Sequence, residues 1–267
     1  ARACLELGEM REARKVARDA IRLAPLDPSA WILLGNVEHG ELNLAEAERA
    51  YTRARELAPG HAHPLLFLAR VRMDQERYPE ALRLLRAAER LSPENSAVRA
   101  EILAASLATG RIGREEAVLG LMQAVGTLLE RRDTASAVVV LNRPCVRKIE
   151  EPRLDNLFAQ ILLDSGNLEW AREEFLKLVE KRPEDVFAVA NAGLIELRIG
   201  RHEAAVGLLE KAVELDAATP VLRMALARAY RGVDRKEDAE RMARTVLSMP
   251  DLPDDLRRDA TGFLESD

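Results

Sequence analysis

The residues best suited to chemistry in this sequence are its histidines, cysteines and carboxylates, and they form no catalytic pattern. His61 and His63 lie two residues apart, so they do not share a helix face and do not predict a metal site. Cys4 and Cys145 belong to no Cys-x-x-Cys or Cys/His spacing. The sequence contains no GxSxG, no phosphate-binding loop and no HExxH motif. We therefore expect no catalytic residue, no metal and no cofactor, and interpret the chain as non-catalytic.

Charge and hydropathy argue against two further kinds of partner. The 40 Lys+Arg residues and 45 Asp+Glu residues give a net charge of −5, so the chain lacks the basic surface that nucleic-acid binding needs. Apolar runs such as residues 137–141 are far shorter than the roughly 18 residues that cross a bilayer. The sequence predicts a soluble protein that neither binds nucleic acid nor inserts into a membrane, and it leaves the cytoplasm and the periplasm open as compartments.

One alanine recurs at a fixed distance and reveals internal repeats. The spacing is 34 residues within each of two series, Ala13, Ala47, Ala81 and Ala171, Ala205, Ala239. Other positions keep this register. One turn position holds Gly8, Gly110, Gly166 and Gly200, with Leu42, Glu76 and Asp234 in the remaining copies, and the copies close on Pro25, Pro59, Pro93 and Pro183.

Each copy predicts two helices joined by the turn. The first helix carries apolar and small residues at helical spacing, as in Trp31, Leu34 and Gly35. The second places small or apolar residues at i, i+4 and i+7, which lets the paired helices approach closely. The closing proline ends the second helix because it lacks an N–H donor and clashes with the preceding turn. The sequence therefore predicts an all-α fold.

This pattern resembles the tetratricopeptide repeat, which carries W-x2-L-G in its first helix, an alanine and an aromatic residue in its second, and a closing proline. The match is closest at residues 31–59, through Trp31, Leu34, Gly35, Ala47, Tyr51, Ala54 and Pro59. In other copies Arg99, Asp155 and Arg223 replace the tryptophan, while Glu38, Arg72 and Glu196 stand where the family prefers tyrosine. The resemblance implies an α-solenoid, a superhelix of helix-turn-helix repeats with a concave inner face.

The two series of alanines are out of phase. Ala81 and Ala171 are 90 residues apart, which is 22 more than two periods. We predict an N-terminal array at 1–110 whose first repeat is truncated, an irregular helical insert or divergent repeat at 111–151, a C-terminal array at 152–252 and a capping helix at 253–267. Within the insert we expect helices at about 114–131 and 134–142. The insert is either a hinge or binding element, or a degenerate repeat with one lengthened helix; repeat arrays absorb insertions, which favours the second interpretation.

The resemblance also implies which residues line the inner groove. The predicted positions are Asn36, His39, Arg70, Met73 and Asp74 in the first array, and Asn156, Gln160, Asp164, Asn191, Leu194, Arg198, Arg228 and Arg231 in the second. We expect the amides in the second array to bind a peptide backbone and Arg228 and Arg231 to attract an acidic portion of it. The Lys and Arg residues with which family members clamp acidic chaperone tails are missing, so that ligand is not expected.

Three hypotheses follow. In the first, the chain is a protein–protein interaction scaffold that binds a peptide or helical segment of a partner in the groove. In the alternative, it is the recognition region of a larger enzyme, or of a bacterial envelope or polysaccharide-secretion assembly. Tetratricopeptide arrays that resemble this one occur in such proteins. The third is self-association through an apolar face at residues 1–27, where Ala1 falls at the eighth position of a first helix and the sequence is expected to begin inside a repeat.

Overall fold

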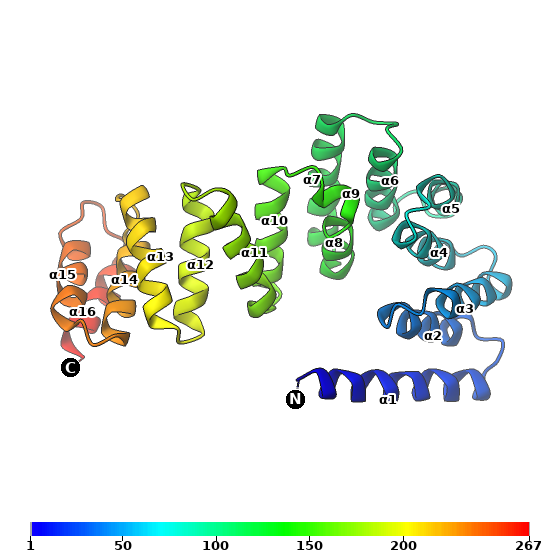
Figure 1. Cartoon of the computed structure of the whole chain (residues 1–267), viewed down its shortest axis with the longest axis horizontal. Coiled ribbons are helices and arrows are strands. Elements are labelled where there is room, and N and C mark those ends of the chain that lie inside the picture. Colours follow the sequence, from blue (N-terminus) through cyan, green and yellow to red (C-terminus); the bar gives the residue numbers. More distant parts are fainter. Residues whose placement is uncertain (1, 267) are drawn as a thin grey trace. The chain divides into compact units, whose positions relative to one another are not determined.

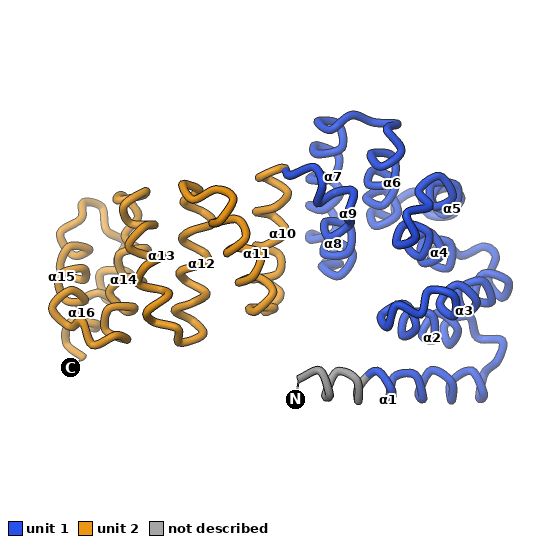
Figure 2. Tube along the Cα trace, viewed as in Figure 1, with its two compact units in different colours: residues 1–150 blue, residues 151–267 orange. Residues whose placement is uncertain are grey.

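The computed structural model describes residues 10–266, and the elements within that range are helices joined by short turns, without a strand (Figure 1). The prediction of an all-α repeat fold is confirmed. The predicted turn at Gly8 and the thiol of Cys4 lie outside the described residues. The chain divides into two compact units, Ala1–Glu150 and Glu151–Asp267, which Figure 2 distinguishes by colour.

Unit 1 stacks helix pairs in chain order and ends in three helices of unequal length. Its helices are α1 (Arg2–Leu23), α2 (Pro28–Gly40), α3 (Leu44–Leu57), α4 (Ala62–Asp74), α5 (Tyr78–Leu91), α6 (Ser96–Ala108), α7 (Arg114–Glu130), α8 (Thr134–Leu141) and α9 (Pro144–Arg147). Each helix from α1 to α7 packs on the next, as expected of an α-solenoid. The short helices α8 and α9 both pack against α6 as well.

Unit 2 repeats the same arrangement more regularly. Its helices are α10 (Pro152–Asp164), α11 (Leu168–Lys181), α12 (Val186–Arg198), α13 (His202–Leu215), α14 (Pro220–Gly232), α15 (Lys236–Leu247) and α16 (Asp254–Glu265). Successive helices pack in order, and α16 packs on both α15 and α14 at the end of the stack. The first helix of most repeats has 13 residues and the second 14, which is why the period is constant.

The turns adopt the backbone conformation that their sequence register predicts. Gly110, Gly166 and Gly200 have φ of 68°, 77° and 79°, in the left-handed region that glycine enters without strain. The non-glycine residues at the same position follow them, with φ of 61° at Leu42, 57° at Glu76 and 60° at Asp234. The repeat register therefore imposes the left-handed turn even where a side chain makes it costly.

Helix α7 explains why the two series of alanines are out of phase. Arg132, which follows α7, has a φ of 60°, and it lies 34 residues before Gly166. Counted back from unit 2, α7 is therefore the first helix of a repeat and α8 is its second helix. Counted forward from unit 1, α7 is instead the second helix of the repeat that begins with α6. One helix serves two repeats, so the interval from Ala81 to Ala171 is about one helix shorter than three full periods. The predicted helices at about 114–131 and 134–142 correspond to α7 and α8.

The recurring alanine lies at the closest packing of each helix pair. Ala47, Ala81, Ala171 and Ala205 are 0% exposed and Ala239 is 1% exposed, whereas Ala13 is half-buried. Gly35 shows how close the helices come, since a Cβ atom added there would lie 2.3 Å from a ring carbon of Tyr51. A larger residue at these positions would force the helices apart.

Where arginine replaces the family tryptophan, it keeps the same hydrogen bond. Trp31 Nε1 donates to the carbonyl of Pro25, six residues earlier, at 2.9 Å. Arg99 donates to Pro93 at 3.4 Å and Arg223 to Ala217 at 2.6 Å, also six residues earlier. The donor therefore ties the first helix to the turn before it in all three copies.

The positions where the family prefers tyrosine form ion pairs between neighbouring repeats. Three pairs span 24 residues each and join a second helix to the next first helix: Arg14 with Glu38, Glu48 with Arg72, and Arg172 with Glu196. The central pair has the opposite polarity to the other two. The carboxylates of Glu38 and Glu196 are well shielded, with side chains 6% and 1% exposed, whereas the Glu48 side chain is 34% exposed. The substitutions are therefore compensated pairs across the repeat interface.

Candidate functional site

The predicted groove residues of unit 1 lie close together, and their polar groups already have partners within the chain. Asn36 Oδ1 accepts a hydrogen bond from the Tyr51 hydroxyl at 2.8 Å, and His39 Nε2 pairs with Asp74. Arg70 Nε donates to Glu101 at 2.8 Å. Met73 was predicted to line the groove, but it is 2% exposed and belongs to the core, because its side chain turns into the helix stack.

Arg143 completes this network from the segment between α8 and α9. Its Nε donates to Glu101 Oε2 at 3.1 Å, one terminal nitrogen donates to Glu101 Oε1 at 3.2 Å, and the other pairs with Asp74. Arg70 also donates to the Ser136 hydroxyl of α8 at 3.2 Å. Arg143 is 5% and Glu101 1% exposed. The part of the inner face of unit 1 that α4 and α6 form is thus contacted by a later part of the same chain, which the sequence did not predict.

The charges in this network stabilise one another. Burial raises the pKa of Glu101, but the nearby guanidinium groups of Arg143 and Arg70 outweigh burial, so its pKa lies below the ordinary value. Asp74 behaves in the same way: burial opposes ionisation, yet His39 and Arg143 hold its pKa below the usual range. Burial by itself would lower the pKa of Arg143. The attraction of the Glu101 and Asp74 carboxylates outweighs burial, so the pKa of Arg143 is raised. Glu101, Asp74 and Arg143 therefore keep their charges near neutral pH.

Unit 2 has an open pocket where four predicted groove residues meet. The pocket has a volume of about 390 Å³ and lies between α10 and α12. It is lined by Leu163, Asp164, Gly166, Asn191, Leu194, Ile195 and Arg198. The half-buried Leu163 and Leu194 provide apolar surface above the buried Ile195, while Asp164, Asn191 and Arg198 provide polar groups. Such a mixture suits a ligand that buries one apolar side chain and places polar groups beside it.

The polar groups of this pocket keep free bonding capacity. Arg198 is exposed, and among the described residues it has no ion-pair or hydrogen-bond partner. Asp164 accepts one hydrogen bond, from Gln160 Nε2 at 2.7 Å, and a carboxylate can accept several. Asn191 Nδ2 donates to the carbonyl of Phe187 at 2.9 Å, which holds the amide in place and leaves its oxygen available. The pocket can therefore donate to an acidic group and accept from a backbone amide.

The remaining predicted groove residues of unit 2 are engaged elsewhere. Asn156 is bonded to Arg182 and Asp185 at 3.3 Å each. Arg228 donates to Asp259 at 2.6 Å, and Arg231 donates to the Ser266 hydroxyl at 2.9 Å and lies over the Phe263 ring. Both arginines thus hold the end helix α16 against α14, because its carboxylate and aromatic ring face them. Their guanidinium groups are therefore paired within unit 2, and the attraction of an acidic ligand stays a prediction.

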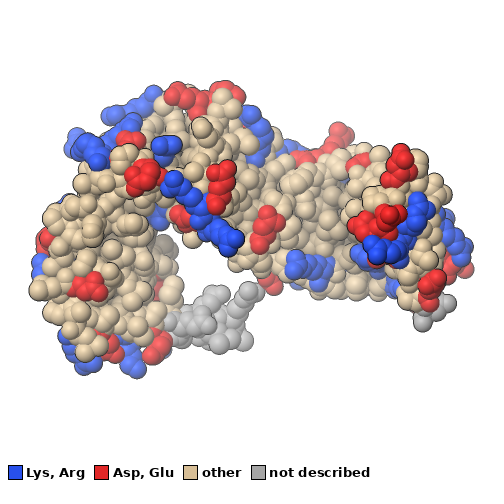
Figure 3. All heavy atoms as spheres, turned by 180° about the vertical axis from the view of Figure 1, so that it is seen from behind, with Lys and Arg blue, Asp and Glu red and all other residues tan. Residues whose placement is uncertain are grey.

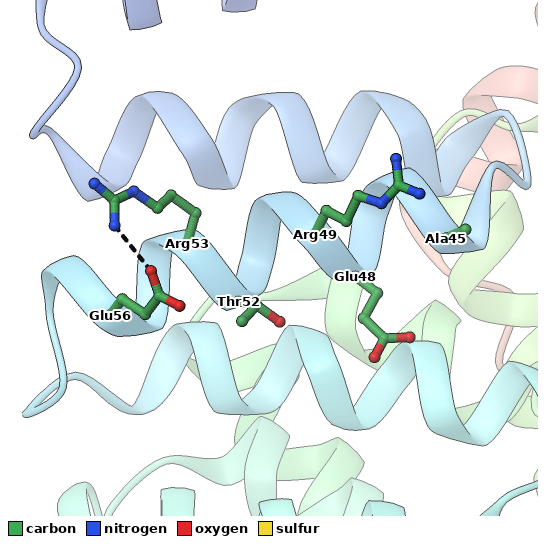
Figure 4. Close-up of a pocket in the computed structure, with 6 residues that line it drawn as sticks. All are labelled: Ala45, Glu48, Arg49, Thr52, Arg53 and Glu56. Carbon is green, nitrogen blue, oxygen red and sulfur yellow. Dashed lines mark hydrogen bonds and ion pairs between the residues drawn. The ribbon is translucent and has the colours of Figure 1, made fainter.

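Two further pockets lie in unit 1. One, of about 500 Å³, is bordered only by residues of α3, with Arg53 and Glu56 ion-paired at 2.8 Å (Figure 4). The other, of about 720 Å³, lies among α1, α2 and α3, and its floor includes Trp31 and Leu34. Arg14 contacts Glu38 and Arg49 contacts Glu46, whereas the guanidinium of Arg18 has no ion-pair or hydrogen-bond partner among the described residues.

The charged surface is mixed. Acidic and basic side chains are interspersed over the visible face of each unit in Figure 3. No group of three or more potential metal ligands occurs among the described residues. Of the helices described, none combines the length and the apolar character needed to cross a membrane.

The fold defines a class of protein: a solenoid in which helix pairs stack in chain order. Two tetratricopeptide repeat family models match the chain, one at residues 40–100 and one at residues 1–62 and 156–220. The chain belongs to the tetratricopeptide repeat family. Repeats of this family indicate a scaffold for protein–protein interaction. No curated protein matches the sequence.

Several solved structures share the repeat fold at low sequence identity. YrrB, described as a tetratricopeptide repeat protein with an unusual peptide-binding site, is 16% identical, with a TM-score of 0.35 over 95% of this chain and 98% of that one. A tetratricopeptide repeat protein from Parabacteroides merdae is 15% identical, with a TM-score of 0.41 over 98% and 94%. Yeast Tom70 is 17% identical, with a TM-score of 0.41 over 93% of this chain and 48% of that one.

Proposed function

We propose that the chain is a non-catalytic scaffold that binds a segment of a partner protein on the inner face of unit 2, at the pocket between α10 and α12. The observation that carries this proposal is the contrast between the two inner faces. The predicted groove residues of unit 1 are bonded within the chain or buried, whereas Arg198 beside the unit 2 pocket has no partner among the described residues.

The chemistry of the pocket describes the segment that it accepts. A volume of about 390 Å³ accommodates one apolar side chain against Leu163 and Leu194. An acidic group of the same segment reaches Arg198, since a guanidinium donates strongly to a carboxylate. A backbone amide donates to the free lone pairs of Asp164. The segment therefore carries an apolar residue next to an acidic residue.

A selected peptide tests this proposal. A displayed random peptide library is selected on the whole chain, and the affinity of the recovered peptide is measured by fluorescence anisotropy. We expect Leu194→Asp and Arg198→Glu each to weaken binding by about ten- to a hundredfold, because each removes a contact at the centre of the site.

Two variants on the same unit serve as matched controls. Leu215→Asp and Arg201→Glu make the same chemical changes at exposed positions outside the pocket. Both controls should bind with unchanged affinity. If Leu194→Asp and Arg198→Glu also bind normally, the partner segment does not use this pocket and the proposal fails.

A further inference from the structure

The inner face of unit 1 contains a socket, the group formed by Arg70, Asp74 and Glu101, that is built around one guanidinium group. Its two carboxylates exceed its one fixed cation by a single negative charge, and Arg143 supplies the missing positive charge. Both oxygens of Glu101 are used, with Oε2 accepting from Arg143 and Oε1 accepting from Arg143 and Arg70. A planar guanidinium matches a carboxylate in this two-pronged way, whereas an ammonium does not.

The segment that carries Arg143 is itself anchored on α6. Val146 is 3% and Ile149 9% exposed, so both contribute apolar contacts. The Cys145 thiol lies 3.6 Å from the carbonyl of Ala104, and α9 packs along α6. Residues 142–149 therefore cover the surface that the first helices α4 and α6 would otherwise present to a ligand.

We propose that the inner face of unit 1 is a guanidinium-binding site, and that Arg143 fills it in cis so that residues 142–149 close this face to partner segments. The site goes beyond the pocket of unit 2, since it involves other residues and another ligand class. When Arg143 is removed, the socket retains a buried carboxylate with unsatisfied acceptors and takes up a guanidinium from solution.

Chemical rescue tests the ligand class. Arg143→Ala and Arg143→Met are prepared in the full chain, and thermal unfolding is followed while methylguanidine is titrated at millimolar concentration. We expect both variants to melt below the unchanged chain, and methylguanidine to raise their melting temperature along a saturating curve. The unchanged chain should show no such rise, because its socket is full.

Matched controls separate binding in the socket from a general solvent effect. Lys148→Ala removes an exposed cation from the same segment and should melt like the unchanged chain, with no response to methylguanidine. Methylammonium should rescue neither Arg143 variant, since it lacks the planar fork. Adding Glu101→Gln to Arg143→Met should abolish the rescue. If a single variant is unfolded in the absence of methylguanidine, recovery of its folding on adding methylguanidine supports the proposal. If methylguanidine has no effect on either single variant, the proposal is wrong.

The reactivity of the Cys145 thiol tests whether residues 142–149 stay packed on α6. Alkylation of this thiol by iodoacetamide, measured by mass spectrometry of its peptide, reports release of residues 142–149 from α6. We expect Arg143→Met to accelerate alkylation by about tenfold, the change that follows when opening becomes easier by about 1.4 kcal/mol. Methylguanidine should not restore the slow rate, because the ligand fills the socket without holding the segment. Equal rates in Arg143→Met, Lys148→Ala and the unchanged chain would show that Arg143 does not keep the face closed.

Discussion

The pair formed by Arg172 and Glu196 offers a sharp test of how the repeats are held together. Arg172 Nε donates to Glu196 Oε1 at 2.6 Å, from α11 to α12. The Glu196 side chain is 1% exposed, and its second oxygen has no partner in the structure. Replacing Arg172 by methionine keeps the aliphatic stem and removes the one cation that is bonded to this carboxylate among the described residues.

The structure sets the size of the expected loss. Breaking a buried ion pair by removing one partner costs about 3–5 kcal/mol, because the remaining charge stays buried and unpaired. The Arg172 side chain is 25% exposed, so water reaches part of the site and the low end, about 3 kcal/mol, applies. At about 3 °C per kcal/mol this lowers the melting temperature of unit 2 by roughly 10 °C.

Tryptophan fluorescence isolates the unit that is measured. The sequence contains 2 tryptophans, Trp31 in unit 1 and Trp170 in α11. In a Trp31→Phe background, urea unfolding followed through Trp170 therefore reports unit 2. Arg244→Met is the matched control, because its ion pair with Glu240 is exposed at 70% and 43% and should contribute less than about 1 kcal/mol.

A double variant separates the loss of the pair from the loss of the arginine itself. Arg172→Met with Glu196→Met leaves no buried charge, so we expect it to recover most of the stability that Arg172→Met loses. If Arg172→Met costs no more than Arg244→Met, the interpretation that these pairs stabilise the repeat interface is wrong.

Two further predictions concern acid stability and glycine packing. Since the folded pKa values of Glu101 and Asp74 are lowered, their contribution to stability is complete above the unfolded value of about 4 and is lost as the pH falls through the folded value. The free energy of unfolding of unit 1, measured through Trp31 in a Trp170→Phe background, should therefore fall as the pH drops below about 4, and more shallowly in Glu101→Gln; equal slopes would contradict this. Gly35→Ala should destabilise unit 1 by about 1–3 kcal/mol in urea unfolding, because its Cβ would strike the buried Tyr51 ring. Gly207→Ala, within α13 and with nothing within 4 Å, should instead stabilise unit 2 by about 0.5–1 kcal/mol, so a loss there would refute the reasoning.

The repeat architecture could be predicted from the sequence because every copy places small and apolar residues at the same helical positions. The alanine spacing placed the helix contacts, and the shared turn position grouped Leu42, Glu76 and Asp234 with the glycines whose left-handed backbone they share. The register also placed Asp164 and Arg198 on one inner face, where they border the same pocket. Local periodicity carries this information, since each element depends on residues close in sequence.

Contacts between distant segments could not be predicted in the same way. Arg143 reaches Asp74 across 69 residues from a segment that lacks the repeat pattern, so no spacing indicates it. Arg228 and Arg231 meet α16, whose position depends on packing at the end of the stack. The ion pairs between repeats could have been predicted from the sequence. Glu38 and Glu196 stand where the family prefers tyrosine, and an arginine lies 24 residues before each of them.

Isotope-labelled methyl groups provide the most direct test of the central claim, which is that unit 2 binds a partner segment between α10 and α12. Methyl resonances of Leu163, Leu194 and Ile195 are recorded while the selected peptide is added, together with those of Leu66 and Ile102 in unit 1. The account predicts that the three pocket residues shift and saturate with the peptide, while the two in unit 1 stay unchanged. Shifts confined to unit 1, or absent from all three pocket residues at saturation, would contradict it.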